Sequence, residues 1–255
     1  MIFDFSIDRG GTFTDIYCEI DHGQRKVNHI MKLLSVDPAN YEDAPTEGIR
    51  RILSEFTQNE IKRGAPIPTN QIRSIRMGTT VATNALLERQ GDKVCLLISK
   101  GLRDCLEIGN QSRPNIFDLE IRKPETIYDH VIEVNERVRP VHEHEADHCQ
   151  NNTIDGANGQ RYKVVQALDL NDVTAQLTEL RKTTDVSSIA VVLMHAYAVP
   201  DHELQIGEIA SKLGFGQVSL SHKIMSRVKL VKRGQTCCVD AYLNPHIRRY
   251  LNGFT

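Results

Sequence analysis

The chain has 255 residues, of which 40% are hydrophobic and 25% charged, and its formal net charge is -2. This composition is typical of a folded protein with a sizeable core, and no basic cluster with interleaved aromatic residues favours nucleic-acid binding. The start of the sequence shows no secretory signal pattern, and no apolar run reaches the roughly 20 residues that span a bilayer. We therefore expect a cytosolic protein whose partners are small molecules, with no nucleic-acid or membrane partner.

The first predicted element is a strand over residues 3–8 in which apolar and polar side chains alternate. Phe3, Phe5 and Ile7 share one face, so Asp8 lies on the opposite face at the end of the strand. A glycine-rich turn and a second β-prone segment follow directly. This arrangement predicts an opening β-hairpin with a carboxylate beside its turn.

The turn has a composition suited to binding phosphate. Its residues are Arg9, Gly10, Gly11, Thr12, Phe13, Thr14 and Asp15. Gly10 and Gly11 have no Cβ and can adopt positive φ, so backbone amides can converge on an anion, while Thr12 and Thr14 add hydroxyl donors. Asp8 would then orient a water of Mg²⁺, a metal that prefers oxygen ligands. An ordinary glycine hairpin between two strands is the alternative.

Strands and helices alternate along the rest of the chain. We expect strands over 27–34, 71–77, 94–98 and 189–194, and helices after Asp43, over 80–90, near 173–180 and over 204–213. A last helical segment over 235–251 is expected to be interrupted at Pro245. This order predicts an α/β fold with a mixed, largely parallel sheet. The six cysteines show no C-x-x-C spacing and are expected to be reduced, mostly in the core.

Residues 139–160 contain many turn-forming residues and few apolar ones, so we expect a surface insertion there. The segment carries four side chains of metal-ligand type, which are His142, His144, His148 and Cys149. Their spacing matches no closed tetrahedral zinc site, and the acidic residues between them suit exposure to solvent. A solvated loop is therefore favoured over a zinc site.

A second polar signal lies at the junction between the strand over 71–77 and the helix that follows it. Thr79 or Thr80 can cap this helix, and Asn84 lies one turn further on. The free amides of a helix start favour a carboxylate or phosphate, although capping by threonine is routine without any ligand. His195 ends a predicted buried strand, where ligands often bind in α/β sheets, but a core histidine is the favoured interpretation.

Residues 7–15 and 78–89 together resemble the amino-terminal region of the hydantoinase A and 5-oxoprolinase family, in particular its ATP-dependent oxoprolinase branch. The same resemblance extends to residues 33–50, 113–119, 133–138, 193–197 and 233–243, and so covers nearly the whole chain. Arg9 is more typical of the oxoprolinase branch than of the hydantoinase branch. Residues 139–160 depart from the family pattern.

The resemblance implies a lobe of the actin-like ATPase and sugar-kinase type, with its first phosphate loop in the opening β-hairpin. The family reaction converts 5-oxo-L-proline, ATP and water to L-glutamate, ADP and phosphate, with Mg²⁺ and a monovalent cation such as K⁺. By resemblance, Asp8 and Thr12 are the expected catalytic residues, with Asp8 also holding the metal through water. The other residues it implies are, for the cofactor, Arg9, Gly10, Gly11, Thr12, Thr14 and Asp15, and, for the substrate, Thr79, Thr80, Asn84 and Arg113.

Family enzymes are much longer than this chain. The resemblance assigns 1–215 to the family's N-terminal domain and 216–255 to the start of a following hydantoinase A domain, so we expect the missing carboxyl-terminal half as a partner and a homodimer at full length. The chain alone is expected to bind ATP weakly and to catalyse no turnover. Three alternatives remain: a non-catalytic module that pairs through an exposed apolar surface, a fragment of an ATP-dependent hydantoinase-like enzyme, and a kinase-like enzyme acting on a sugar or acyl group.

Overall fold

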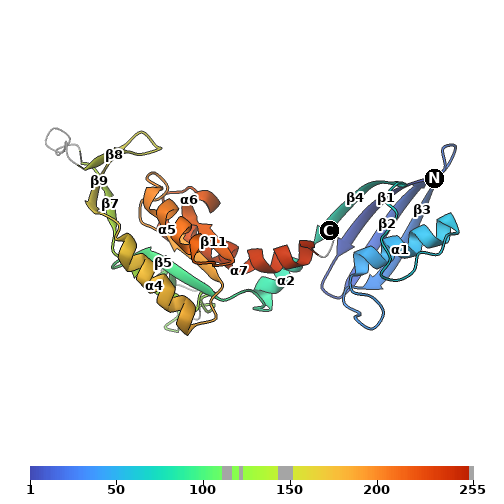
Figure 1. The fold of residues 1–255 in the computed structure, drawn as a ribbon, viewed down its shortest axis with the longest axis horizontal. Helices are drawn as coiled ribbons and strands as arrows, with labels where there is room; N and C mark the ends of the chain where they lie inside the picture. Colours follow the sequence, from blue (N-terminus) through green and yellow to red (C-terminus); the bar gives the residue numbers. More distant parts are fainter. Residues whose placement is uncertain (111–116, 121–122, 143–151, 253–255) are drawn as a thin grey trace. The chain divides into compact units, whose positions relative to one another are not determined.

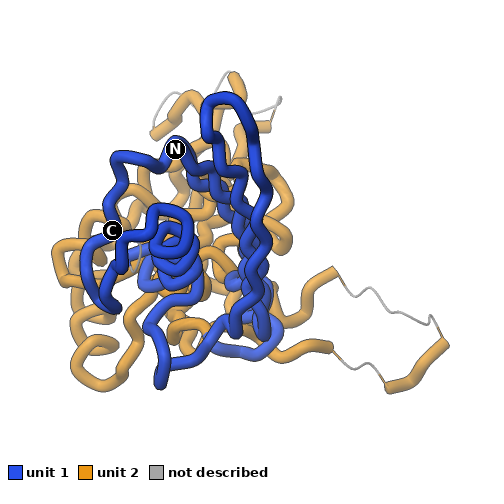
Figure 2. Tube along the Cα trace, turned by 90° about the vertical axis from the view of Figure 1, so that its right-hand side faces the viewer, with its two compact units in different colours: residues 1–90, 247–255 blue, residues 91–246 orange. Residues whose placement is uncertain are grey.

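The computed structural model describes residues 1–110, 117–120, 123–142 and 152–252 (Figure 1). The chain divides into two compact units, shown in different colours in Figure 2. The first comprises Met1–Gln90 and Ile247–Thr255, and the second comprises Gly91–His246. The predicted boundary near residue 215 separates two family domains and not two compact units, and it stays a prediction.

The first unit contains a mixed sheet of four strands in the order β3-β2-β1-β4. These strands are β1 (Ile2–Arg9), β2 (Phe13–Asp21), β3 (Lys26–Leu34) and β4 (Ile72–Thr79). Strands β1, β2 and β3 form an antiparallel meander, whereas β4 runs parallel to β1. The opening hairpin is therefore confirmed, and the carboxyl ends of β1 and β4 meet at one edge of the sheet.

Helix α1 (Ala44–Thr57) packs against one face of this sheet, as Figure 1 shows. Its apolar residues Ile49, Ile52 and Leu53 belong to one core cluster with the inward side chains of β1 and β2. Asp43 caps the helix as predicted, because its carboxylate accepts the amide of Thr46 at 2.8 Å. The opposite face of the sheet carries polar side chains such as Asp8, which is exposed. This alternation is the period of two that the sequence shows in residues 3–8.

The second unit contains a parallel sheet of four strands in the order β11-β10-β5-β6. Its strands are β5 (Val94–Ser99), β6 (His130–Val134), β10 (Ser188–Val192) and β11 (Gln217–Leu220). Every residue of β5 and β10 is buried, which is the pattern of strands covered on both faces. Helices α4 (Leu170–Thr183) and α5 (Asp201–Lys212) share a core cluster with these strands, with Leu177 and Ile206 fully buried.

Helix α7 (Leu230–Asn252) is one continuous helix, so the predicted interruption at Pro245 is wrong. A proline inside a helix removes one amide hydrogen bond and crowds the carbonyl four residues before it, but packing on either side can hold the helix together. A Cβ at Gly234 would lie 3.1 Å from Cγ1 of Val192 and 2.7 Å from Cδ2 of Leu106. This close approach lets α7 pack against β10 within the second unit.

The described residues at the two ends of 139–160 belong to a small sheet that the sequence does not predict. Strands β7 (Arg137–Pro140), β8 (Thr153–Asp155) and β9 (Arg161–Gln166) form a small antiparallel sheet in the order β7-β9-β8. Tyr162 is fully buried in its own cluster with Val138 and Ala198, and a single buried aromatic residue of this size anchors the sheet. His144, His148 and Cys149 lie outside the described residues.

The remaining described helices are short. They are α2 (Val81–Leu87), α3 (Cys105–Ile108) and α6 (Ser221–Ile224). Within the described ranges no helix is both long and apolar enough to cross a bilayer. The cysteines at 18, 95, 105, 237 and 238 are free thiols, and burial raises the pKa of Cys18 and of Cys95 to about 12.

Candidate functional site

The two polar signals of the sequence meet in the first unit. Thr79 at the end of β4 lies opposite Arg9 at the end of β1, and its hydroxyl donates to the Arg9 carbonyl at 3.2 Å. The amide of Thr80 reaches the same carbonyl at 3.3 Å. A Cβ at Gly11 would lie 2.9 Å from Nδ2 of Asn84. The glycine loop and the start of α2 are therefore neighbours, as the parallel pairing of β1 and β4 requires.

The backbone of the loop differs in two respects from the sequence prediction. Gly10 donates its amide to the Phe13 carbonyl at 2.9 Å, so this amide closes the hairpin and is not available to a ligand. Neither Gly10 nor Gly11 adopts positive φ. Glycine is instead favoured by close approach, because a Cβ at Gly10 would lie 3.2 Å from the Phe13 carbonyl oxygen.

The amides of Gly11 and Thr12 are the donors that the loop presents to solvent. Both residues are exposed, and within the described residues neither amide has a hydrogen-bond acceptor. Adjacent free amides of this kind form an anion-binding concavity. The loop is therefore able to accept a phosphate oxygen at these two positions.

Ser35, which the sequence analysis missed, holds the loop from behind. Its hydroxyl donates to the Gly10 carbonyl at 2.7 Å, and its amide donates to the Thr12 carbonyl at 2.9 Å. The hydroxyl of the fully buried Thr14 lies 3.0 Å from that of Ser35. The predicted contact between Thr14 and a ligand is therefore wrong, because its side chain is turned into the core. The only sequence signal for Ser35 is a small polar residue at the end of a predicted strand.

Two carboxylates face each other at the end of the hairpin. Asp8 and Asp15 are direct partners in the β1–β2 register, and both are exposed. Lys32 forms an ion pair with Asp15 at 3.0 Å, whereas the Asp8 carboxylate has no partner among the described residues. Like charges directly opposite each other are unfavourable, so a bound cation would be stabilised here. Hard oxygen donors in this arrangement fit Mg²⁺, which keeps several of its waters.

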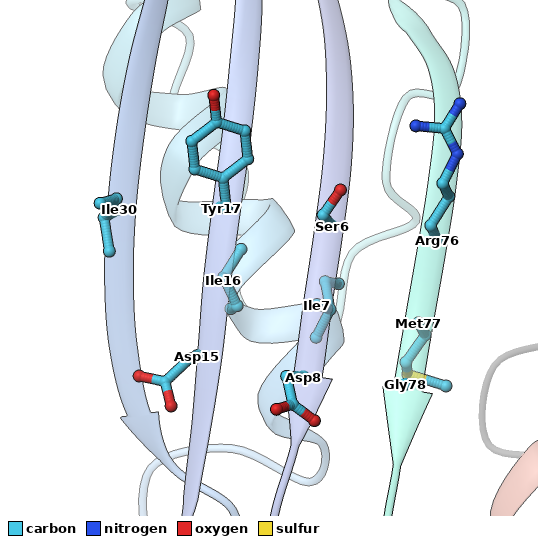
Figure 3. Close-up of a pocket in the computed structure, with 10 residues that line it drawn as sticks. All are labelled: Ser6, Ile7, Asp8, Asp15, Ile16, Tyr17, Ile30, Arg76, Met77 and Gly78. Carbon is cyan, nitrogen blue, oxygen red and sulfur yellow. The ribbon is translucent and has the colours of Figure 1, made fainter.

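A pocket of about 500 Å³ opens on the same face of the sheet. Figure 3 shows the side chains that line it, which include Ser6, Asp8, Asp15, Tyr17, Ile30 and Arg76. Gly78 lies beside Asp8 in the register and has no side chain to fill the space. The pocket therefore extends from the Asp8–Asp15 pair to the middle of the sheet face opposite α1, which we call the open face.

Arg9 lies on the other side of the loop from this pocket. Its guanidinium group stacks over the ring of Tyr250 at 4.6 Å from the ring centroid, and Nη2 donates to the Ser35 carbonyl at 3.4 Å. Because residues alternate along β1, Arg9 and Asp8 point to opposite faces. Direct binding of a cofactor by Arg9 stays a prediction, and the contacts present support a role in holding the loop.

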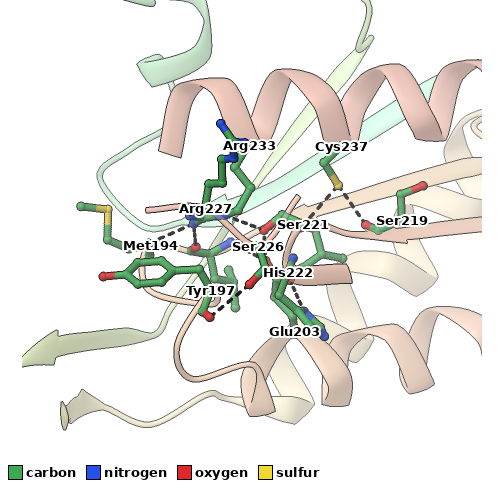
Figure 4. A network of polar contacts seen from close by, with 12 residues as sticks. Met194, Tyr197, Glu203, Ser219, Ser221, His222, Ser226, Arg227, Arg233 and Cys237 are labelled. Atoms are coloured by element: carbon green, nitrogen blue, oxygen red, sulfur yellow. Dashed lines mark hydrogen bonds and ion pairs between the residues drawn. The ribbon is translucent and has the colours of Figure 1, made fainter. Parts of the chain in front are cut away.

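A separate polar network lies at the carboxyl ends of the parallel strands in the second unit (Figure 4). The fully buried Glu203 accepts hydrogen bonds from the Leu193 amide, the Ser221 hydroxyl and the His222 amide. The fully buried Arg233 donates to the Ser221 hydroxyl and to the backbone carbonyls of Arg227 and Met194. Every polar group of this pair has a partner, so the network is explained by folding alone.

His195 lies beside this network, between the rings of Tyr162 and Tyr197. Its buried Nδ1 has no hydrogen-bond partner in the structure, and burial lowers its pKa from the ordinary value. The prediction of a core histidine with its polar atoms satisfied is therefore not met, because the side chain is only half-buried and Nδ1 lacks a partner among the described residues. Arg113, the remaining predicted substrate residue, lies outside the described residues.

Comparison with known proteins identifies the family. Residues 4–214 match the model of the hydantoinase/oxoprolinase N-terminal region. The chain is 51% identical to 5-oxoprolinase 1 of Arabidopsis thaliana over 98% of this chain and 19% of that protein. It is 49% identical to 5-oxoprolinase of Dictyostelium discoideum, again over 98% of this chain and 20% of that protein. The chain thus spans about a fifth of the length of these relatives.

Two solved structures share the fold. ATP-dependent caprolactamase from Pseudomonas jessenii aligns with a TM-score of 0.71 at 23% identity, over 98% of this chain and 33% of that one. A nucleotide-free acetone carboxylase aligns with a TM-score of 0.69 at 18% identity, over 97% and 33%. These likenesses confirm the predicted α/β fold. Together with the family match, they show that the chain belongs to the hydantoinase/oxoprolinase family, of which it carries the N-terminal region.

Proposed function

We propose that the first unit binds the phosphates of ATP and Mg²⁺ for an ATP-dependent 5-oxoprolinase. The observation that carries this proposal is the pair of exposed, unbonded amides at Gly11 and Thr12, next to the unpaired carboxylate of Asp8. Relatives at 41% to 51% identity carry the name 5-oxoprolinase, which supports the choice of reaction. The complete reaction converts 5-oxo-L-proline, ATP and water to L-glutamate, ADP and phosphate, a step of glutathione metabolism.

The chemistry explains why nucleotide and lactam are coupled. A lactam carbonyl is a poor electrophile because the nitrogen lone pair is delocalised into it, and the nitrogen is in addition a poor leaving group. Transfer of the γ-phosphoryl group breaks its bond to ADP and forms a bond to the lactam oxygen. Water then adds to the activated carbon, the carbon–nitrogen bond breaks, the nitrogen takes up a proton and phosphate leaves. Fixed amide donors that stabilise the charge of the transferring group are the main contribution of such a loop.

Individual residues have distinct roles in this proposal. The amides of Gly11 and Thr12 hold the phosphate, and Asp8, with Asp15 opposite, orients the waters of Mg²⁺. Thr79 and Asn84 fix the shape of the loop through their contacts with it. A monovalent cation such as K⁺, a cytosolic location and a homodimer of the full-length enzyme are parts of the same proposal. Its remaining catalytic parts lie in the rest of that enzyme.

The proposal is tested by titrating the 255-residue chain with Mg-ADP and with ADP alone, followed by the amide resonances of the loop. We expect the largest shifts at Gly11 and Thr12. Asp8→Asn should weaken Mg-ADP binding by about tenfold, equivalent to 1.4 kcal/mol, and abolish the difference between Mg-ADP and ADP. Glu60→Gln, an exposed acidic site of the same unit, is the matched control. Equal binding of both nucleotide forms by the unmodified chain, or shifts confined to the second unit, would exclude this function.

A further inference from the structure

The open face of the first sheet is organised in rows that cross all four strands. One row consists of Arg76 on β4, Ser6 on β1, Tyr17 on β2 and Ile30 on β3, as the strand register requires. The next row toward the loop contains Gly78, Asp8, Asp15 and Lys32 in the same strand order. The pocket lies over these two rows (Figure 3).

Arg76 is the cation of these rows that makes no hydrogen bond or ion pair with a described residue, although, after the hydrogen bonds from Arg73, its charge helps to lower the pKa of the nearby Asp4. Lys32 is paired with Asp15, and further along β4 Arg73 is paired with Asp4 and Asp21. Arg76 is exposed and forms no hydrogen bond or ion pair with any described residue. A guanidinium group has a planar set of donors that matches a carboxylate in bidentate geometry. Arg76 is therefore available to bind an anionic group inside the pocket.

The pocket also has an apolar side and a hollow floor. Tyr17 and Ile30 remain 39% and 73% exposed, which is high for large side chains on a sheet. Ser6 is small and Gly78 has no side chain, so no large side chain fills the space between Arg76 and Asp8. A volume of about 500 Å³ falls within the range of small-molecule sites.

We infer that this pocket binds the acyl substrate, a small cyclic amide that carries a carboxylate. This inference rests on the proposed function, because a lactam that receives the γ-phosphoryl group must place its oxygen beside the phosphate loop. The substrate carboxylate binds Arg76, its ring packs against Tyr17 and Ile30, and its carbonyl points toward Asp8. Asp8 lines the pocket and directly precedes the loop, so it lies between nucleotide and substrate.

The test compares 5-oxo-L-proline with 2-pyrrolidinone, which is the same ring without the carboxylate. Both are titrated into the 255-residue chain in the presence of Mg-ADP and followed by backbone resonances. We expect 5-oxo-L-proline to bind more tightly and to shift Tyr17, Ile30 and Arg76. Arg76→Gln should weaken 5-oxo-L-proline binding by roughly 10- to 100-fold and leave 2-pyrrolidinone unchanged, because a charge-assisted hydrogen-bond pair is lost.

Arg25→Gln, at an exposed arginine in the turn between β2 and β3, is the matched control and should leave both affinities unchanged. Retention of the nucleotide-induced shifts at Gly11 and Thr12 in Arg76→Gln shows that the variant is folded. Nucleotide binding without any effect of Arg76→Gln on 5-oxo-L-proline, or without any binding of 5-oxo-L-proline, overturns this inference while the proposed function stands. Loss of nucleotide binding in the unmodified chain would instead remove the proposed function.

Discussion

The charged side chains next to the two four-stranded sheets of this protein differ in burial and in pairing. In the second unit, Glu203 and Arg233 are fully buried and every polar group between them has a partner. In the first unit, Asp8 and Arg76 are exposed on one face and have no partner among the described residues. Burial requires pairing because a lone charge in the core is costly, whereas exposed charges on a face can be left for a ligand. The contrast favours a folding role for the second network and is in line with the binding role proposed for the first face.

The largest expected effect is on the buried network. Arg233→Met removes donors to the Ser221 hydroxyl and to the carbonyls of Leu193 and Met194, and leaves these buried acceptors with fewer partners. We expect the free energy of unfolding of the second unit to fall by about 3 to 5 kcal/mol. Urea unfolding with hydrogen exchange measured by mass spectrometry assigns the change to that unit. Lys232→Met, at an exposed position of the same helix, should have little effect, and a loss below about 1 kcal/mol for Arg233→Met would contradict the comparison.

A smaller effect is expected from a paired carboxylate in the first unit. Glu47 in α1 is buried and accepts hydrogen bonds from Arg50 and Arg51 at 2.7 Å, and these bonds lower its pKa from 4.5 to about 2. Because the folded pKa is the lower one, this contribution to stability is complete above pH 4.5 and is lost as the pH falls toward 2.

The contribution of Glu47 should be about 1 to 3 kcal/mol, measured as how much more the unfolding free energy of the unmodified protein falls from pH 6 to pH 2 than that of Glu47→Gln. Glu47→Gln cannot titrate at this position, so its unfolding free energy should fall less steeply between these pH values. Parallel curves for the two proteins would show that Glu47 is not stabilised by its arginine partners.

Local sequence patterns were sufficient for most of the fold. The cap at Asp43, the alternation in β1 and the apolar run of β5 each lie within a few residues, and the structure confirms all three. The continuity of α7 across Pro245 and the small sheet around Tyr162 depend on packing with distant segments, so the sequence did not predict them. Long-range contacts of this kind override local propensity.

The candidate site likewise has parts that the sequence predicts and parts that it does not. The meeting of the glycine loop with the start of α2 follows from parallel strands whose carboxyl ends share one edge, and was predictable from their order. The role of Ser35 and the position of Arg76 beside Ser6 depend on a hydrogen bond and a strand register that join residues 25 and 70 positions apart. Such pairings cannot be predicted from a motif within a single segment.

The smallest expected change in stability has the opposite sign and tests the comparison most directly. Asp8 lies opposite Asp15, and Lys32 pairs only with Asp15, so Asp8→Asn removes a repulsion without breaking a contact. We expect the unfolding free energy to rise by about 0.2 to 0.5 kcal/mol while Mg-nucleotide binding falls. Asp4→Asn on the same strand is the matched control and should lower stability, because Asp4 accepts hydrogen bonds from Arg73 and Ser74. If both variants lowered stability alike, Asp8 would be a structural residue like Asp4, and the open face would have no unpaired carboxylate to offer a metal ion.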